Sequence, residues 1–347
     1  MAPDMHSPSS ARVGAALRRA NRWGFLEIAL WLLAVAAWFF LPEQHLLLAE
    51  IVNFAILALS LDLILGYAGI VSLGQSAMYG VGAYATGLFS AHVTGEPLSG
   101  LVVGGLAGAA VAFLTGFLLL RGADLTRLMV TLGVAAVFME IANQADWLTG
   151  GADGLQGVET APLFGLFEFD IFGRTAYAYS LGVLFVLIVV ARIVLASPFG
   201  YSLRAIRDNP LRASAVGIPV NARLIAIYTL SGAYAGIAGA LFTETQMFVS
   251  LDALSFQKSA DGLMILTIGG TGYLYGGLVG AFVYKLIQDV LSNLTPQYWQ
   301  FWIGLLLVAF VLIGRERPRA LVRAVSARLA RPFAGKAAGR RVAEEKP

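Results

Sequence analysis

The chain of 347 residues contains no cysteine and only three histidines. The lack of cysteine excludes disulfide bonds, thiol catalysis and cysteine-ligated metal sites. The histidines, His6, His45 and His92, are scattered, and no HExxH zinc motif occurs. We therefore expect no catalytic residues, no metal site and no bound cofactor.

A phosphate-binding loop is also missing from the sequence. The nearest candidate is Gly335–Lys336, which lacks the upstream glycine of such loops and is followed by Ala337. ATP hydrolysis within this chain is therefore poorly supported. If the chain moves a solute, the energy must come from an ion gradient or from another subunit.

Charged residues are scarce, at 13% of the chain, whereas soluble globular proteins have about 25%. Hydrophobic residues make up 58%, and apolar runs of about 17 residues or more recur. The sequence thus predicts an all-α, polytopic membrane protein. We expect a polar N-terminal segment (residues 1–24), a membrane domain (25–314) and a basic tail (315–347).

Lysine and arginine concentrate in four segments, which hold 21 of the 24 basic residues. They are the N-terminus, residues 121–127, residues 192–223 and the tail. Because basic residues gather on the cytoplasmic side of membrane proteins, we expect these segments and both termini in the cytoplasm. Bringing them all to one side favours ten crossings. The run 259–268 is too short for a straight span, so a re-entrant pair with eight or nine crossings stays open.

Two glycine-rich stretches interrupt apolar runs in the two halves of the chain. They are GYAGIVSLG (residues 66–74) and GGTGYLYGG (residues 269–277), and the first, fourth and ninth residues of each are glycine. Such interruptions in a transporter predict broken helices near the substrate path. The candidate residues for this path are Asp62, Gly66, Gly69, Ser72, Gly269 and Gly272.

Few ionisable residues lie inside the expected spans, where an unpaired charge is costly. Asp62 lies one turn before Gly66, so it either lines the path or binds backbone amides freed by the break. Four others lie near span ends and either extend to the aqueous boundary, which we favour, or contribute to a pathway, namely Glu50, Glu140, Lys285 and Asp289.

The polar segment 197–223 predicts a short helix with both ends marked in the sequence. Asp208 or Asn209 suits the N-cap, and Pro210 suits the first helical position. Gly217 suits the left-handed residue that follows a helix. A helix of about two turns is marginal alone, so it needs a partner. An ordinary basic loop is the alternative interpretation.

Four blocks together resemble the membrane subunits of branched-chain amino acid ABC importers, of the LivM type. The blocks are LDLILGYAGIVSLGQSAMYGVGAYATGL (61–88), TGGADGLQGV (149–158), SPFGYSLRAIRDNPLRASAVGIPVNARLIAIYTLSGAYAGIAGALF (197–242) and GLMILTIGGTGYLYGGLVGA (262–281). They occur in the family's order. The resemblance implies a heteromeric importer in the bacterial inner membrane. Its other parts would be a LivH-like permease, two ATPase subunits and a periplasmic binding protein.

The resemblance also gives the polar segment a role, because importer permeases present a cytoplasmic coupling helix to the ATPase. The positions that match its signature are Asn209, Pro210, Ala213 and Gly217. Ala213 is small and is expected to allow close approach of the partner. Leu211 and Arg212 depart from the usual Glu and Ala. The basic residues Arg204 and Arg207 either pair with acidic groups on the ATPase or hold the loop in the cytoplasm.

Besides an importer permease, the sequence leaves two other functions open: a stand-alone secondary transporter or channel, and a membrane scaffold or receptor. The first predicts charged residues deep in several spans, and only Asp62 and Glu244 qualify. The second leaves the glycine-broken spans without a role. We expect contact with membrane lipid and none with nucleic acid. The resemblance leaves branched-chain amino acids, other amino acids, urea or short amides, and aromatic acids open as substrates.

The topology can be tested with single cysteines, because the chain has none of its own. A cysteine introduced near Gly154 should react with a membrane-impermeant maleimide added outside, since segment 149–175 is acidic. Labelling of that cysteine only from the cytoplasmic side would contradict this orientation.

Overall fold

The structure is a computed structural model that describes residues 24–313, apart from 121, 123, 164, 166 and 171. The expected basic tail and residues 1–23 of the expected N-terminal segment lie outside the described residues. The first half contains α2 (Phe25–Phe40), α3 (His45–Ala68), α4 (Gln75–His92), α5 (Pro97–Leu119), α6 (Asp124–Gln144), α7 (Asp146–Thr149) and the 3-10 turn η1 (Gly151–Asp153). The second half contains α8 (Arg174–Ala196), α9 (Pro198–Asp208), α10 (Pro210–Ala215), α11 (Val220–Gln246), η2 (Leu251–Leu254), α12 (Phe256–Gly269), α13 (Gly276–Leu294) and α14 (Trp299–Ile313).

The predicted all-α, polytopic class is confirmed. In the described ranges, extended pairing is limited to two isolated bridges in the loops. Five described helices are long and apolar enough to cross a membrane, namely α3, α5, most of α6, α8 and α11. The others are shorter or less apolar, so the count of eight to ten crossings stays a prediction.

The chain forms two compact units, one ending at Lys285 and one beginning at Leu286, within α13. The first unit contains both glycine-rich stretches and the polar loop, and it is the unit in which the functional residues lie. The second contains the remainder of α13 and the apolar α14.

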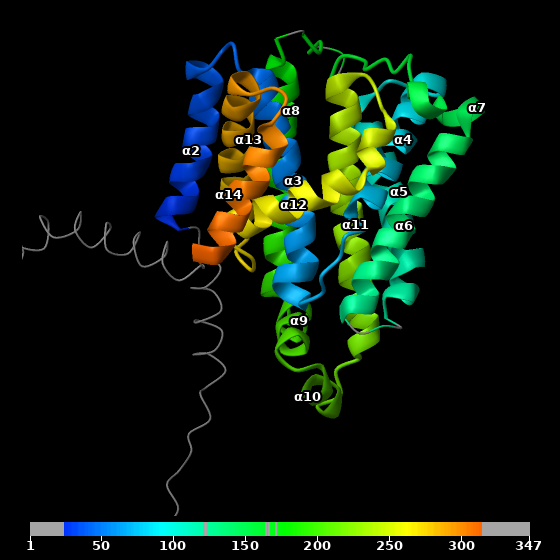
Figure 1. Ribbon diagram of the computed structural model, residues 1–347, viewed down its shortest axis with the longest axis vertical. Coiled ribbons are helices and arrows are strands. Elements are labelled where there is room, and N and C mark those ends of the chain that lie inside the picture. The colour runs from blue at the N-terminus through cyan, green and yellow to red at the C-terminus, as the bar shows by residue number, and fades with distance from the viewer. Residues whose placement is uncertain are drawn as a thin grey trace, which may run out of the picture. The chain divides into compact units, whose positions relative to one another are not determined.

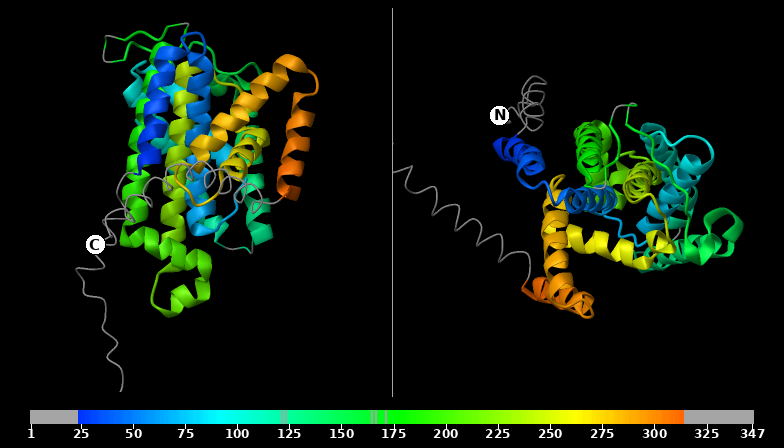
Figure 2. Two further views of the ribbon diagram at one scale, coloured as in Figure 1. Left: turned by 90° about the vertical axis from the view of Figure 1, so that its left-hand side faces the viewer. Right: turned by 90° about the horizontal axis from the view of Figure 1, so that it is seen from above.

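Helix α3 is the centre of the first unit. It packs against α8, α11 and α12, and nearly all of its residues from Leu48 to Ala68 are buried. A helix that is apolar on every side has no polar face to turn toward water, and it is stable only when other helices surround it. Figures 1 and 2 show α9 and α10 extending from one end of this bundle, opposite the loops around α7.

Glycines let α4, α5 and α11 approach closely. A Cβ atom at Gly82 would lie 2.5 Å from the Cα of Gly236, and one at Gly236 would lie 3.1 Å from the Cα of Gly108. A side chain at any of these positions would therefore force the helix backbones apart. Gly100, Gly104 and Gly108 recur every four residues along α5, and this spacing places them on the face that packs against neighbouring helices.

Helix α12 lies across the bundle, as Figure 1 and the right-hand view of Figure 2 show. With 14 residues it reaches about 21 Å, less than the ~30 Å hydrocarbon core. The run 259–268, which is too short for a straight span, thus belongs to a short helix that lies across the bundle.

The expectation that Lys285 reaches water at a span end is wrong. Its side chain is 6% exposed, and its Nζ lies 2.5 Å from Oε1 of Glu50 on α3. The ammonium also lies 4.4 Å from the centre of the Phe54 ring. A buried charge needs a partner, and here α3 supplies both a carboxylate and an aromatic face.

Candidate functional site

Both glycine-rich stretches contain non-helical breaks, as predicted, but the breaks are shorter than the stretches. The first covers residues 69–74, between α3 and α4, and the second covers residues 270–275, between α12 and α13. Gly66 and Gly269 are still helical. Gly69 has φ +75° and Gly272 has φ +78°, a left-handed conformation that glycine adopts without strain.

Asp62 joins the two breaks. Its side chain is buried, and its Oδ1 accepts a hydrogen bond of 2.7 Å from the backbone N–H of Gly272. Of the two roles considered for Asp62, the binding of a freed backbone amide is therefore observed. The amide, however, belongs to the other break, 210 residues away in sequence. Gly66 leaves room for this contact, because a Cβ there would lie 2.5 Å from the Gly272 nitrogen.

Arg207, from the polar loop, completes the same cluster. Its Nη1 donates a hydrogen bond to the carbonyl oxygen of Gly66, one of the last four carbonyls of α3. Its Cγ lies so close to Gly69 that a Cβ there would approach it to 2.8 Å. The positive guanidinium thus lies at the negative end of the α3 dipole. The structure thus brings Arg207, expected to act in coupling, into contact with Gly66 and Gly69, expected on the substrate path.

Ser72 stabilises the first break itself. Its buried hydroxyl accepts a 3.2 Å hydrogen bond from the N–H of Gly74. The neighbouring N–H of Leu73 donates to Thr131 Oγ1 on α6 at 3.1 Å. The Ser72 hydroxyl therefore binds a backbone amide within the break. If Ser72 also contacts the substrate path, the same hydroxyl serves both purposes.

Sequence reasoning missed Gln75, the first residue of α4. Its Nε2 donates to Ser231 Oγ at 2.6 Å, and that hydroxyl donates to the carbonyl oxygen of Ser60 at 2.6 Å. The chain of bonds links α4, α11 and α3 directly beside the first break. An amide side chain after a glycine-rich loop, inside an apolar run, was the available signal.

The polar loop contains two helices where the sequence predicted one. The additional helix, α9, follows Ser197 and has Pro198 at its first position, which is a typical helix start that the prediction overlooked. In α10, Asn209 is the N-cap and its Oδ1 accepts from the N–H of Arg212 at 2.9 Å. Asp208, the alternative cap, instead ends α9. The helix ends at Ala215, one residue earlier than expected, and Gly217 has φ +91° as predicted.

The expectation that Ala213 offers close approach to a partner is wrong. Ala213 is only 4% exposed, because α10 folds back onto α9 and α11. The most exposed apolar residues of this loop are Leu211 (82%) and Val216 (78%). The guanidinium of Arg204 lies over the rings of Tyr67 and Tyr201, at 5.6 and 5.4 Å from their centres.

Comparison with known proteins identifies the family. Residues 46–311 match the family described as "Branched-chain amino acid transport system / permease component". The chain belongs to this permease family. It is an ABC-type permease subunit that spans the membrane several times, and it is not an enzyme.

Individual relatives are similar at a moderate level. The high-affinity branched-chain amino acid transport system permease protein LivM of Escherichia coli K12 is 27% identical over 85% of this chain and 74% of its own length. The autoinducer 2 import system permease protein LsrC of Klebsiella pneumoniae is 27% identical over 86% of this chain and 87% of its own. No solved structure matches the chain significantly.

The Asp62 contact predicts a local effect on the second break. In Asp62→Leu the N–H of Gly272 loses its buried acceptor, which should destabilise the protein by about 1–3 kcal/mol. Hydrogen–deuterium exchange should become faster around residues 270–275, and Asp62→Asn, which retains an oxygen, should change it less. As a control, Asn53→Leu removes a bond to the carbonyl of Ala238 and should leave exchange at residues 270–275 unchanged. Unchanged exchange in Asp62→Leu would contradict the contact.

Proposed function

We propose that this chain is a translocation subunit of an importer for branched-chain or related amino acids. It would work with a second, LivH-like permease, two ATPase subunits and a periplasmic binding protein in the bacterial inner membrane. The proposal is supported by the family match and by the relatives named LivM. A permease named for autoinducer 2 import is also 27% identical, so identity at this level leaves the substrate class undecided.

The substrate class is tested through the soluble component. The binding protein encoded beside this chain should bind leucine, isoleucine or valine in a calorimetric panel that also contains urea, short amides and aromatic acids. Loaded with its ligand, it should stimulate ATP hydrolysis by the reconstituted importer. Binding of urea or an aromatic acid alone would replace the amino acid assignment and leave the role as an importer permease intact.

The observation that carries the proposed mechanism is the position of Arg207 between the polar loop and both breaks. Helix α9 packs against α3, α8 and α11, with Leu203 and Ile206 buried in that contact. Helix α10 packs against α9, and Ala213 of α10 is buried. The loop is thus a rigid extension of the bundle, and rigid elements transmit displacement as a body.

Docking on the ATPase would use the exposed tip of α10. Leu211 and Val216 provide apolar side chains that water surrounds in the isolated chain, and burying them against a partner is favourable. Displacement of α9 would then move Arg207. Because Arg207 binds Gly66 and contacts Gly69, and Asp62 binds Gly272, both breaks would move with it.

Two substitutions separate docking from transmission. Leu211→Asp should reduce recovery of the ATPase in a pull-down by about tenfold, since removal of a central apolar anchor typically costs more than 1 kcal/mol. Val93→Asp adds the same charge to an exposed position outside the loop and should have no effect. Arg207→Ala should leave ATPase recovery within about twofold but lower the stimulation of ATP hydrolysis by the loaded binding protein.

Each variant has an outcome that contradicts the mechanism. Normal assembly and normal coupled hydrolysis in Leu211→Asp would show that α10 is not the docking element. Normal stimulation in Arg207→Ala would show that the Gly66 contact does not transmit. Ala213→Trp is a poor docking probe, because a large side chain there would separate α10 from α9.

A further inference from the structure

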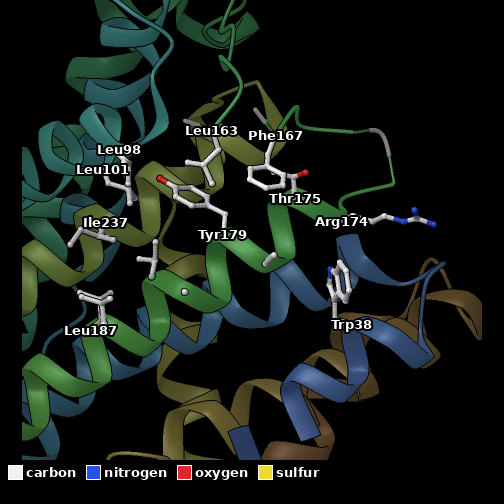
Figure 3. Close-up of a pocket in the computed structure, with 14 residues that line it drawn as sticks. Trp38, Leu98, Leu101, Leu163, Phe167, Arg174, Thr175, Tyr179, Leu187 and Ile237 are labelled. Atoms are coloured by element: carbon white, nitrogen blue, oxygen red, sulfur yellow. The ribbon is translucent and has the colours of Figure 1, made fainter. Parts of the chain in front are cut away.

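A cavity of about 680 Å³ lies apart from the breaks, between α2, α5, α8 and α11. Its wall is apolar along most of its length, with Leu98 and Leu101 on one side and Val186, Leu187 and Ile237 at the inner end. Figure 3 shows Leu98, Leu101, Leu187 and Ile237 beside α8, with Tyr179 between them and the loop that carries Phe167. None of the residues assigned to coupling or to the path lines it.

The mouth of the cavity differs from its interior. Arg174, the only basic residue of segment 149–175, lies at this end together with Trp38. In the described part of the chain, no carboxylate lies within ion-pair distance of the Arg174 guanidinium. Asp170 accepts a hydrogen bond of 2.9 Å from the backbone N–H of Arg174, so a carboxylate lies at the start of α8, the same end of the cavity.

The length of the cavity matches one leaflet of a bilayer. Arg174 and Leu187 are 13 residues apart on α8, which corresponds to about 20 Å along the helix. Half of a bilayer, including its headgroup region, is also about 20 Å thick. A phosphate at Arg174 would therefore lie at headgroup level, Trp38 would lie where aromatic residues gather at the membrane boundary, and an acyl chain would extend to Leu187 and Ile237.

We propose that this cavity binds one glycerophospholipid whose headgroup carries an amine, with the phosphate on Arg174 and one acyl chain along α8. The arginine provides the charge complement for the phosphate. The carboxylate of Asp170 favours a headgroup with a cationic amine over one with a net negative charge. The apolar interior beyond the mouth matches an acyl chain and offers the charged groups of a free amino acid no partner there.

Gly182 makes the proposal testable without disturbing the fold. It lines the middle of the cavity, and a Cβ there would meet no atom within 4 Å. Gly182→Phe should thus fill the space that the acyl chain needs. Gly133→Phe is the matched control, because Gly133 on α6 is equally open and lies outside the cavity.

The experiment uses the full-length chain, purified with the subunits that accompany it, in nanodiscs of equal parts phosphatidylethanolamine and phosphatidylglycerol. After mild detergent extraction, native mass spectrometry counts the retained lipids. The unaltered chain and Gly133→Phe should retain one phosphatidylethanolamine that Gly182→Phe lacks. Arg174→Gln should weaken its retention by about fivefold, as expected for an exposed charge pair, and Arg174→Lys should restore most of it.

Three outcomes would overturn the assignment. Equal retention in Gly182→Phe and Gly133→Phe would show that the cavity holds no lipid. Loss of the second permease in Gly182→Phe, with lipid retention unchanged, would show that this surface contacts a subunit. Preference for phosphatidylglycerol would refute the amine-bearing headgroup. If Gly182→Phe does not fold, undiminished retention in Arg174→Gln refutes the site by itself.

Discussion

The need to satisfy backbone polar groups inside an apolar bundle governs this structure. Where α3 and α12 are interrupted, the carbonyl and amide groups freed by the two breaks need partners that the helices no longer provide. The chain meets this need with side chains from distant segments: Arg207 for the carbonyl of Gly66 and Asp62 for the amide of Gly272. Local backbone satisfaction and long-range connection are therefore the same contacts.

This arrangement has a mechanical consequence. Ordinary helix caps come from neighbouring residues and fix only one helix end. Here the cap of α3 comes from α9, and the ligand of the second break comes from α3, so three segments share one cluster. The tight packing around Gly66 and Gly69 leaves little freedom for one segment to move alone. The loop outside the bundle is thereby connected to the two non-helical breaks inside it.

Small residues and empty space have opposite roles in different parts of the same helix bundle. At Gly82, Gly108 and Gly236 a neighbouring backbone occupies the space that a side chain would fill, and α4, α5 and α11 therefore lie close together. At Gly182 the space is occupied by no protein atom, and it opens a cavity along α8. Sequence spacing alone does not distinguish the two, because both are glycines in apolar helices.

The sequence by itself determined the helical class, the two breaks and the capped helix α10. These depend on local signals: apolar runs, proline at helix starts, and glycine where φ is positive. Only the tertiary structure decided which residues meet. Arg207 on Gly66, Asp62 on Gly272, the burial of Ala213 and the pairing of Lys285 with Glu50 all join distant segments. No periodicity or cap signal encodes such contacts. They depend on which helices pack side by side, and the local pattern of apolar and polar residues does not specify that.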